Sequence, residues 1–470
     1  MWGFLGSAAL LLLAGCAHYE ARPLAPDRTA AAFASRRLDD PGLAAFARHT
    51  LSPAPSVWPP PAWDLTNLTL AAIYFHPDLK VARARWAAAV AGERTAGERP
   101  NPTLSVTPAY NTTTAVPSPW LVTPTLDLPL ETAGKRRHRQ DVARSLAAVA
   151  RLDLAASVWQ VRAGVRTALT ELAAATEAEA VLRGQQALQA DNLALLTRQQ
   201  EAGAISAFEM TQARLAADQT RLAWGDAKRR IAEARTRLAG AVGLAGEALE
   251  GVAISLAGLE PPSDALAPLA EARRIALSSR PDVLAALATY AAAEATLALE
   301  IAKQYPDIHL NPGYEFDQGD NKWSLGLTIT LPVLHQNGGA IGEADGHRAE
   351  AAARFEALQA RVIAGLDRAD SACRAAAERQ QETGTWVEHL REQEGRVAGQ
   401  VEAGALARID LVALRLQLAT ANLASLDARA RLLQALGDWE DAVQDPALLP
   451  GRHLRLPSAP PTLTPKETQP

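Results

Sequence analysis

Two pairs of segments alternate apolar and polar residues at the two-residue period of a β-strand. Thr103 to Tyr110 and Leu121 to Leu130 form one pair, and Ile308 to Phe316 and Trp323 to Leu331 form the other. The clearest apolar face is that of the last segment, which carries Trp323, Leu325, Leu327, Ile329 and Leu331. A strand that crosses a membrane at a tilt needs about 9 to 11 residues. The pattern therefore predicts four transmembrane strands.

The segments around these strands carry apolar residues at spacings of three and four, which predicts helices. One such row runs from His138 to Gln200, and at 1.5 Å per residue this helix would be roughly 95 Å long. Short turns at Gly203 and Gly404 each lead into a further helix, and Leu416 to Val443 is close to a heptad row. A heptad row favours left-handed coiled-coil packing. We therefore expect two long antiparallel helical hairpins.

The two halves of the chain repeat each other. Landmarks of the first half recur 204 positions later, where Pro77-Asp78, Pro102, Pro108 and Tyr110 become Pro281-Asp282, Pro306, Pro312 and Tyr314. The run Glu201 to Ala204 likewise recurs as Glu402 to Ala405. A period this long indicates a duplicated domain rather than a solenoid. We expect repeats at 64–250 and 267–445, joined by a linker at 251–266. The first begins with a helix from Asp64 to Glu98 that is broken near Pro77.

The amino terminus resembles a bacterial lipoprotein signal. Trp2 to Leu13 is apolar but too short to span a bilayer, and it ends in Leu13-Ala14-Gly15-Cys16. Small residues admit a peptidase and the thiol accepts a diacylglyceryl group, so we predict a signal peptide at 1–15 and lipidation at Cys16. An ordinary secretory signal is the alternative, and the absence of Lys or Arg before the apolar run leaves the true start open. Ala17 is not the aspartate that retains lipoproteins at the inner membrane, which favours the outer membrane.

The ends of the chain have no helical or strand period. Residues 16–63 are rich in Pro, Ala and Arg, and we interpret them as an extended, lipid-anchored tether. We expect the Pro-rich residues 446–470 to be disordered.

Composition narrows the possible functions. The 470 residues carry a net charge of -5, and acidic and basic residues are mixed along the chain. This charge pattern does not indicate nucleic-acid binding. If Cys16 is acylated, only Cys373 remains, and its place on an apolar row predicts a buried thiol without a disulfide. We find no catalytic motif, no metal site and no cofactor site, and we predict that the chain is not an enzyme.

We expect the basic run from Lys135 to Arg139 to face headgroups or cap charge at the membrane boundary.

Four strands cannot stand alone in lipid, because no water satisfies the free amides of an open sheet edge. Two copies of the chain would close an eight-stranded barrel, which side chains fill, whereas three copies give twelve strands and can leave a lumen. The smallest assembly with a pore is therefore a trimer. The alternative is a soluble layer of β-hairpins in a periplasmic protein.

Together, the lipoprotein signal, the duplication, the strand pairs and the Glu-Ala-Gly-Ala turns resemble the TolC-like outer membrane factor family from Asp64 to Val443. The resemblance implies a mainly α fold with a small β part, assembled as a homotrimeric α-barrel and β-barrel channel. It also implies a passive exit duct of a tripartite efflux system, with a periplasmic adaptor and an inner-membrane transporter as partners. The rival class is a lipid-anchored periplasmic scaffold without a pore. The exported substrate, whether heavy metal, drug or organic solute, stays open.

The resemblance also implies roles for residues at the helical tips. The positions that match the family's adaptor contacts are Gly203, Ala204, Ile205, Ser206, Gly404, Ala405, Leu406 and Ala407. Six residues beyond each glycine stand Glu209 and Asp410, and the latter matches an acid that lines the narrowest point of the family's tunnel. Ala413 replaces a second acid that the family often has one turn later. The alternative is that both acids only favour a helix amino terminus.

Overall fold

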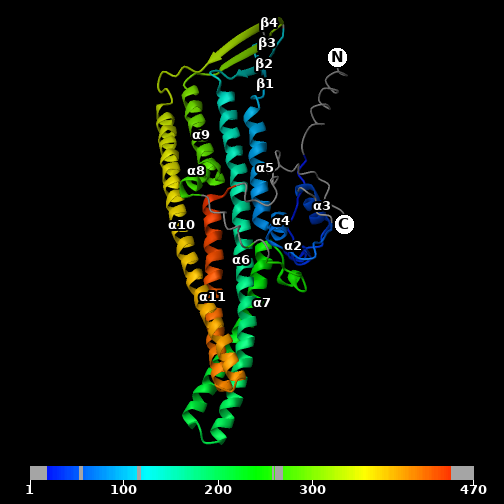
Figure 1. Cartoon of the computed structure of the whole chain (residues 1–470). Helices are drawn as coiled ribbons and strands as arrows, with labels where there is room; N and C mark the ends of the chain where they lie inside the picture. Colours follow the sequence, from blue (N-terminus) through cyan, green and yellow to red (C-terminus); the bar gives the residue numbers. More distant parts are fainter. Residues whose placement is uncertain (1–17, 52–56, 114–117, 257–258, 260–267, 446–470) are drawn as a thin grey trace.

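The computed structural model describes residues 18–51, 57–113, 118–256, 259 and 268–445. The molecule is elongated, with a four-stranded sheet at one end and two helical hairpin tips at the other (Figure 1). Long helices run between these ends, so the chain has the mainly α fold with a small β part that the sequence predicts.

The two halves repeat one order of elements. The first half comprises α4 (Leu65–Phe75), α5 (Pro77–Gly97), β1 (Thr103–Tyr110), β2 (Trp120–Leu130), α6 (Lys135–Glu201), α7 (Ala207–Val242) and the short η1 (Gly246–Leu249). The second comprises α8 (Leu269–Ser279), α9 (Pro281–Ala302), β3 (Ile308–Asp317), β4 (Asp320–Ile329), α10 (Gly338–Glu402) and α11 (Arg408–Val443). The predicted strands and long helices are confirmed.

Local chemistry fixes the element boundaries. Pro77 and Pro281 each occupy the first turn of a helix, where the missing N–H costs nothing, and they separate α4 from α5 and α8 from α9. At the tips, Gly203 and Gly404 have φ values of 70° and 73°. These left-handed conformations favour glycine, and they let each long helix end and its antiparallel partner begin within a few residues.

Each half has its own core of equivalent residues. In the first half, Val161, Val165, Leu172, Leu238 and Val242 are buried together. In the second half, their places are taken by Val362, Leu366, Cys373, Trp439 and Val443, each 201 positions later. The shared spacing aligns α6 with α10 and α7 with α11. It also places the Cys373 thiol in the core as predicted, where its Sγ lies 3.1 Å from the Ala435 carbonyl oxygen.

The amino-terminal segment differs from the extended tether that the sequence suggested. It forms α2 (Pro26–Ala34) and α3 (Pro41–Thr50), and Leu43 is fully buried in the first core. Arg36 Nη1 donates to the carbonyl oxygens of Phe75, at 3.0 Å, and Gly243, at 2.9 Å, where α4 and α7 end. Only a few isolated apolar residues and one arginine of this segment dock onto the core, and such contacts leave no periodic pattern in the sequence. The prediction of an extended tether was wrong for this reason.

Several predictions fall outside the described residues. The signal peptide, Cys16 and the tail at 446–470 cannot be compared with the structure, and neither can most of the linker at 251–266. The described start of that linker forms a parallel bridge, in which Ile254 pairs with Trp63. The domain boundaries themselves stay predictions.

Candidate functional site: the sheet, the helical seam and the tips

The four strands form one antiparallel sheet in the order β1-β2-β3-β4. The central pairing joins the two halves of the duplication, with Val122 opposite Phe316 and Leu128 opposite Leu310. Only β1 and β4 lie at the edges, and within the described residues neither has a second partner strand. The sheet is therefore open at both sides.

One face of this sheet is apolar on all four strands. On β4 it carries Trp323, Leu325, Leu327 and Ile329, of which the first three are 84%, 76% and 61% exposed. Leu331, the fifth residue of the predicted face, lies beyond the end of β4 and is also exposed. The face continues across the sheet because directly paired residues point to the same side, as Leu310 and Leu327 do.

Aromatic pairs stand at the hairpin ends of this apolar face. The rings of Tyr110 and Trp120 lie 5.1 Å apart, and those of Tyr314 and Trp323 lie 5.0 Å apart. Tyr and Trp are enriched where a membrane meets water, because one end of the ring system is apolar and the other is polar. The sheet thus has the features of a membrane wall with an aromatic belt.

The opposite face of the sheet is polar. His309 Nδ1 lies 3.0 Å from the Asp127 carboxylate across β2 and β3, and Asn311 donates to the Thr328 hydroxyl at 2.9 Å. Lys322 pairs with Asp317 near the second hairpin. Polar groups on one side and lipid-compatible groups on the other are the pattern of a barrel with an aqueous interior.

Charged residues join the sheet to the helices. Lys135 is buried and its Nζ lies 2.7 Å from Asp307, which also accepts a hydrogen bond from the Thr132 N–H at 2.9 Å. Arg136 donates to the Gly97 carbonyl oxygen, and Arg139 pairs with Glu131. Lys135, Arg136 and Arg139 of the basic run are therefore bonded inside this junction, whereas Arg137 is exposed.

Below the junction, α6 and α11 pack along a seam that contains a buried ion cluster. Glu440 lies 2.9 Å from Arg162 and 2.5 Å from Arg166, and both arginines are almost completely buried. Next to them, burial raises the pKa of Asp441 to about 6, although the two arginines oppose this shift. Sequence reasoning missed the cluster. Its only signal was two arginines inside an apolar helical row.

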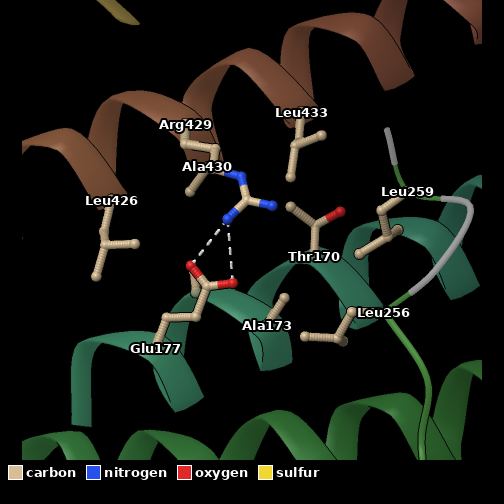
Figure 2. Close-up of a pocket in the computed structure, with 10 residues that line it drawn as sticks. Thr170, Ala173, Glu177, Leu256, Leu259, Leu426, Arg429, Ala430 and Leu433 are labelled. Carbon is tan, nitrogen blue, oxygen red and sulfur yellow. Dashed lines mark hydrogen bonds and ion pairs between the residues drawn. The ribbon is translucent and has the colours of Figure 1, made fainter. Parts of the chain in front are cut away.

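A cavity of about 290 Å³ lies further along the same seam (Figure 2). Leu256, Leu259, Leu426 and Leu433 give it an apolar lining, and the Arg429 guanidinium extends across it from α11 toward Glu177 on α6. Arg429 Nη1 lies 3.3 and 3.2 Å from the two carboxylate oxygens of Glu177. This pair ties the two halves of the chain together below the buried cluster.

The two tips have the same turn geometry. The N–H of Ala204 donates to the Gln199 carbonyl oxygen at 2.8 Å, and that of Ala405 donates to the Gln400 carbonyl oxygen at 2.8 Å. The remaining predicted contact residues lie in the same turns, at Ile205, Ser206, Leu406 and Ala407. Because the turns are equivalent, the two tips expose the same backbone conformation.

Both predicted gate acids bond to their own helix. Glu209 accepts from the Ser206 N–H at 2.7 Å and the Ser206 hydroxyl accepts from the Glu209 N–H, which makes a capping box. The Ser206 hydrogen bonds lower the pKa of Glu209. Asp410 Oδ2 accepts from the Ala407 N–H at 3.1 Å. Both acids thus stabilise the amino terminus of their helix. A role for either acid at a constriction stays a prediction.

An ionic contact links the second tip to the first hairpin. Arg408, two residues before Asp410, lies 3.5 Å from Asp191 on α6. Both side chains are more than half exposed, so their attraction is weakened by solvent. The contact therefore contributes little to holding the two hairpins together.

Comparison with known proteins gives the same architecture. The family model described as "Outer membrane efflux protein" matches residues 71–244 and 272–438. The chain is 27% identical over 226 residues to the cobalt-zinc-cadmium resistance protein CzcC of Cupriavidus metallidurans. That match covers 47% of this chain and 53% of CzcC, so the chain spans about half the length of this relative.

Solved structures show the similarity of fold. The outer-membrane channel OprN has a TM-score of 0.68 at 18% identity, over 91% of this chain and 99% of OprN. The outer membrane protein VceC of Vibrio cholerae has a TM-score of 0.67 at 19% identity, over 81% of this chain and 96% of VceC. The open state of the Neisseria gonorrhoeae channel MtrE has a TM-score of 0.65 at 16% identity, over 83% and 90%.

Proposed function

The chain belongs to the outer membrane efflux protein family, and we propose that it forms a homotrimeric exit duct across the outer membrane and the periplasm. The description of the family supports a role as the channel component of an efflux system, and we propose this role rather than that of an enzyme. Its sheet would lie in the outer membrane, and its helices would extend into the periplasm.

The observation that carries the proposal is the open sheet with one apolar face. An unpaired edge is costly in lipid, since each free backbone group loses its hydrogen bonds to water. Pairing β4 of one copy with β1 of the next would satisfy both edges. Three copies of the four-stranded sheet would then close a twelve-stranded barrel with the Asp127 and His309 face inside.

The partners follow from the length of the helices. Helices of 67 and 65 residues would reach roughly 100 Å at 1.5 Å per residue. Such hairpins would place the tips at Gly203 and Gly404 deep in the periplasm. We propose that a periplasmic adaptor binds these tips and couples the duct to an inner-membrane transporter that supplies the energy.

The cargo that we favour is a cation. The polar face of the sheet carries Asp127, Glu315 and Asp317 but only one lysine, Lys322. A lumen with an excess of carboxylates attracts cations. Divalent metal ions fit this preference, and CzcC is described as a cobalt-zinc-cadmium resistance protein.

Detergent extraction separates the channel from a scaffold without a pore. We expect the protein to purify from outer membranes as a trimer, and the trimer to conduct ions in planar bilayers. A monomer that becomes water-soluble once the amino-terminal anchor is removed would contradict the proposal. A trimer that inserts but never conducts would contradict the exit-duct function.

We also propose that Cys16 carries the lipid. A radioactive fatty acid should label the natural protein and leave Cys16→Ser unlabelled. The barrel of this variant should still insert, because the strands supply the membrane affinity. Label that persists in Cys16→Ser would refute the assignment.

A further inference from the structure

We propose that Glu378 on α10 forms an ion pair with Lys228 on α7 of a neighbouring copy, an inference that rests on the trimeric duct proposed above. Both residues are exposed. Within the described part of the chain, neither has an ionic partner at hydrogen-bonding distance. The Lys228 Nζ instead lies 3.2 Å from the centroid of the Trp224 ring, where a cation is held without a counter-charge.

The duplication indicates which helix faces are left uncovered. The long helix α6 packs against α5 and α7 of its own half and against α9 and α11 of the other half. Its counterpart α10 packs against α8, α9 and α11, all of its own half. In Figure 1 the carboxyl-terminal part of α7 lies on the far side of α6 and α11 from α10. The contact that α6 makes with α11 therefore has its equivalent between α10 and α7 of a neighbouring copy.

The alignment of the two cores gives the register of this missing contact. Residues that fill the second core lie 201 positions after those of the first, as Val362 follows Val161 and Trp439 follows Leu238. The same displacement takes Glu177 to Glu378. It also takes Lys228 to Arg429, so the acid and the base are both preserved at equivalent positions.

The equivalent contact within the chain is visible in the cavity of the α6–α11 seam (Figure 2). There Glu177 and Arg429 meet across the two helices at 3.2 Å. If the seam between copies repeats this packing, the Glu378 carboxylate faces the Lys228 ammonium group. Charge complementarity at a defined register thus identifies a second copy of this chain as the occupant of the open α10 face.

The other ionic contacts of the seam are not repeated. At the same displacement, the pairs Arg162 with Glu440, Arg166 with Glu440, and Arg408 with Asp191 correspond, in the same order, to Ile363 with Ala239, Asp367 with Ala239, and Ala207 with Glu392. None of these equivalents joins opposite charges. The Glu378 pair is therefore the contact of this set that can fix the register between copies.

Cysteine cross-linking in the intact trimer tests the pair. Glu378→Cys combined with Lys228→Cys should convert the trimer to covalent oligomers under mild oxidation, whereas each single variant should not. Cys373 can stay in place, because burial raises the pKa of its thiol to about 11 and keeps it unreactive. The matched control combines Glu378→Cys with Arg230→Cys, which lies two residues along α7 and about 200° around the helix.

The outcomes are separable. Covalent oligomers for the Lys228 pair and none for the Arg230 pair would support the contact. A trimer by native mass that fails to cross-link, or that cross-links equally in both pairs, would overturn this inference and leave the proposed duct standing. Monomers in every variant and in the natural protein would overturn the duct itself. As a second measurement, Glu378→Lys and Lys228→Glu should each lower the temperature at which the trimer dissociates, and the double exchange should restore it.

Discussion

At the scale of single residues, buried charges distinguish the seam between α6 and α11. Arg162 and Arg166 are removed from water, and Glu440 supplies the nearby negative charge. Burying ions is costly, and the cost is offset only while each ion keeps its partner. The cluster therefore makes the relative position of the two helices depend on one carboxylate.

Replacement of this carboxylate should destabilise the protein strongly. Glu440→Gln leaves two buried guanidinium groups without a counter-charge, and we expect a loss of about 3 to 5 kcal/mol. The loss should appear as a lower midpoint in thermal unfolding followed by circular dichroism in detergent. The exposed pair of Glu233 and Arg229 provides the control, since solvent weakens its attraction and Glu233→Gln should leave the midpoint almost unchanged. Equal midpoints for both variants would contradict a structural role for the cluster.

The neighbouring Asp441 should make stability depend on pH. Its pKa is raised from 3.8 to about 6, mainly by burial, while Glu440 and Asp438 add to the shift and Arg162 and Arg166 oppose it. Because the folded state holds this proton more tightly, stability is greatest below the unfolded pKa and falls as pH rises from about 4 to about 6.

Asp441→Asn should remove that dependence. We expect the variant to be more stable than the natural protein at pH 7.5, on the order of 2 kcal/mol, with the difference vanishing toward pH 4. Melting temperatures measured across this range provide the test. A constant difference at all pH values would show that the side chain acts through packing rather than through its charge.

At the scale of elements, the sequence predicted the features that depend on a local period. The helix expected from His138 to Gln200 is α6, from Lys135 to Glu201, and four alternating segments form four paired strands. The hydrophobic period and the helix-capping residues are encoded within a few neighbouring residues, so they can be recognised in the sequence without knowledge of the fold.

Features that need two distant segments were not predictable in this way. The pairing of Glu440 with Arg162 depends on the alignment of α6 with α11, which no local pattern specifies. The docking of α2 and α3 depends on a surface made by other elements. For Asp410, the sequence identified the position, whereas the bond to Ala407 emerged only from the structure.

The two faces of β4 should respond differently to the same charge. Leu327→Arg places a guanidinium in lipid and should cost about 2 to 4 kcal/mol per chain near mid-bilayer, so a trimer incurs the cost three times. Thr328→Arg adds the charge to the polar face and should be tolerated. Outer membrane fractions of cells that produce each variant should contain only the second. Equal damage by both would mean that the strand does not lie in a membrane.

At the scale of the whole molecule, the proposed trimer makes the chain one third of a closed tube whose seams are unequal. The seam within the chain has a buried cluster and further ion pairs, whereas in its proposed equivalent between copies only Glu378 and Lys228 keep opposite charges at these positions. The weaker seams are therefore the ones between copies. If the tube dilates, the hairpins should move along these seams, with the tips moving furthest from the fixed sheet.

Charge at those tips should influence which ions the channel conducts. Three copies of Asp410 would form a negative ring where the tunnel narrows, and mutual repulsion would make the closed state conditional on cations or hydrogen bonds. Because Asp410 also caps α11 through the Ala407 N–H, the test needs two substitutions. Asp410→Asn removes the charge and keeps an oxygen that can cap, whereas Asp410→Ala removes both.

In planar bilayers, both variants should therefore show a reduced preference for cations. Only Asp410→Ala should add an effect of the lost cap, seen as a further change in resting conductance. Glu209→Ala should alter conductance less, because Glu209 lies at the tip of the other hairpin, whereas Asp410 is the acid that matches the family's narrowest point. If ion selectivity is unchanged in both Asp410 variants, this residue only caps its helix. The constriction must then lie among other side chains.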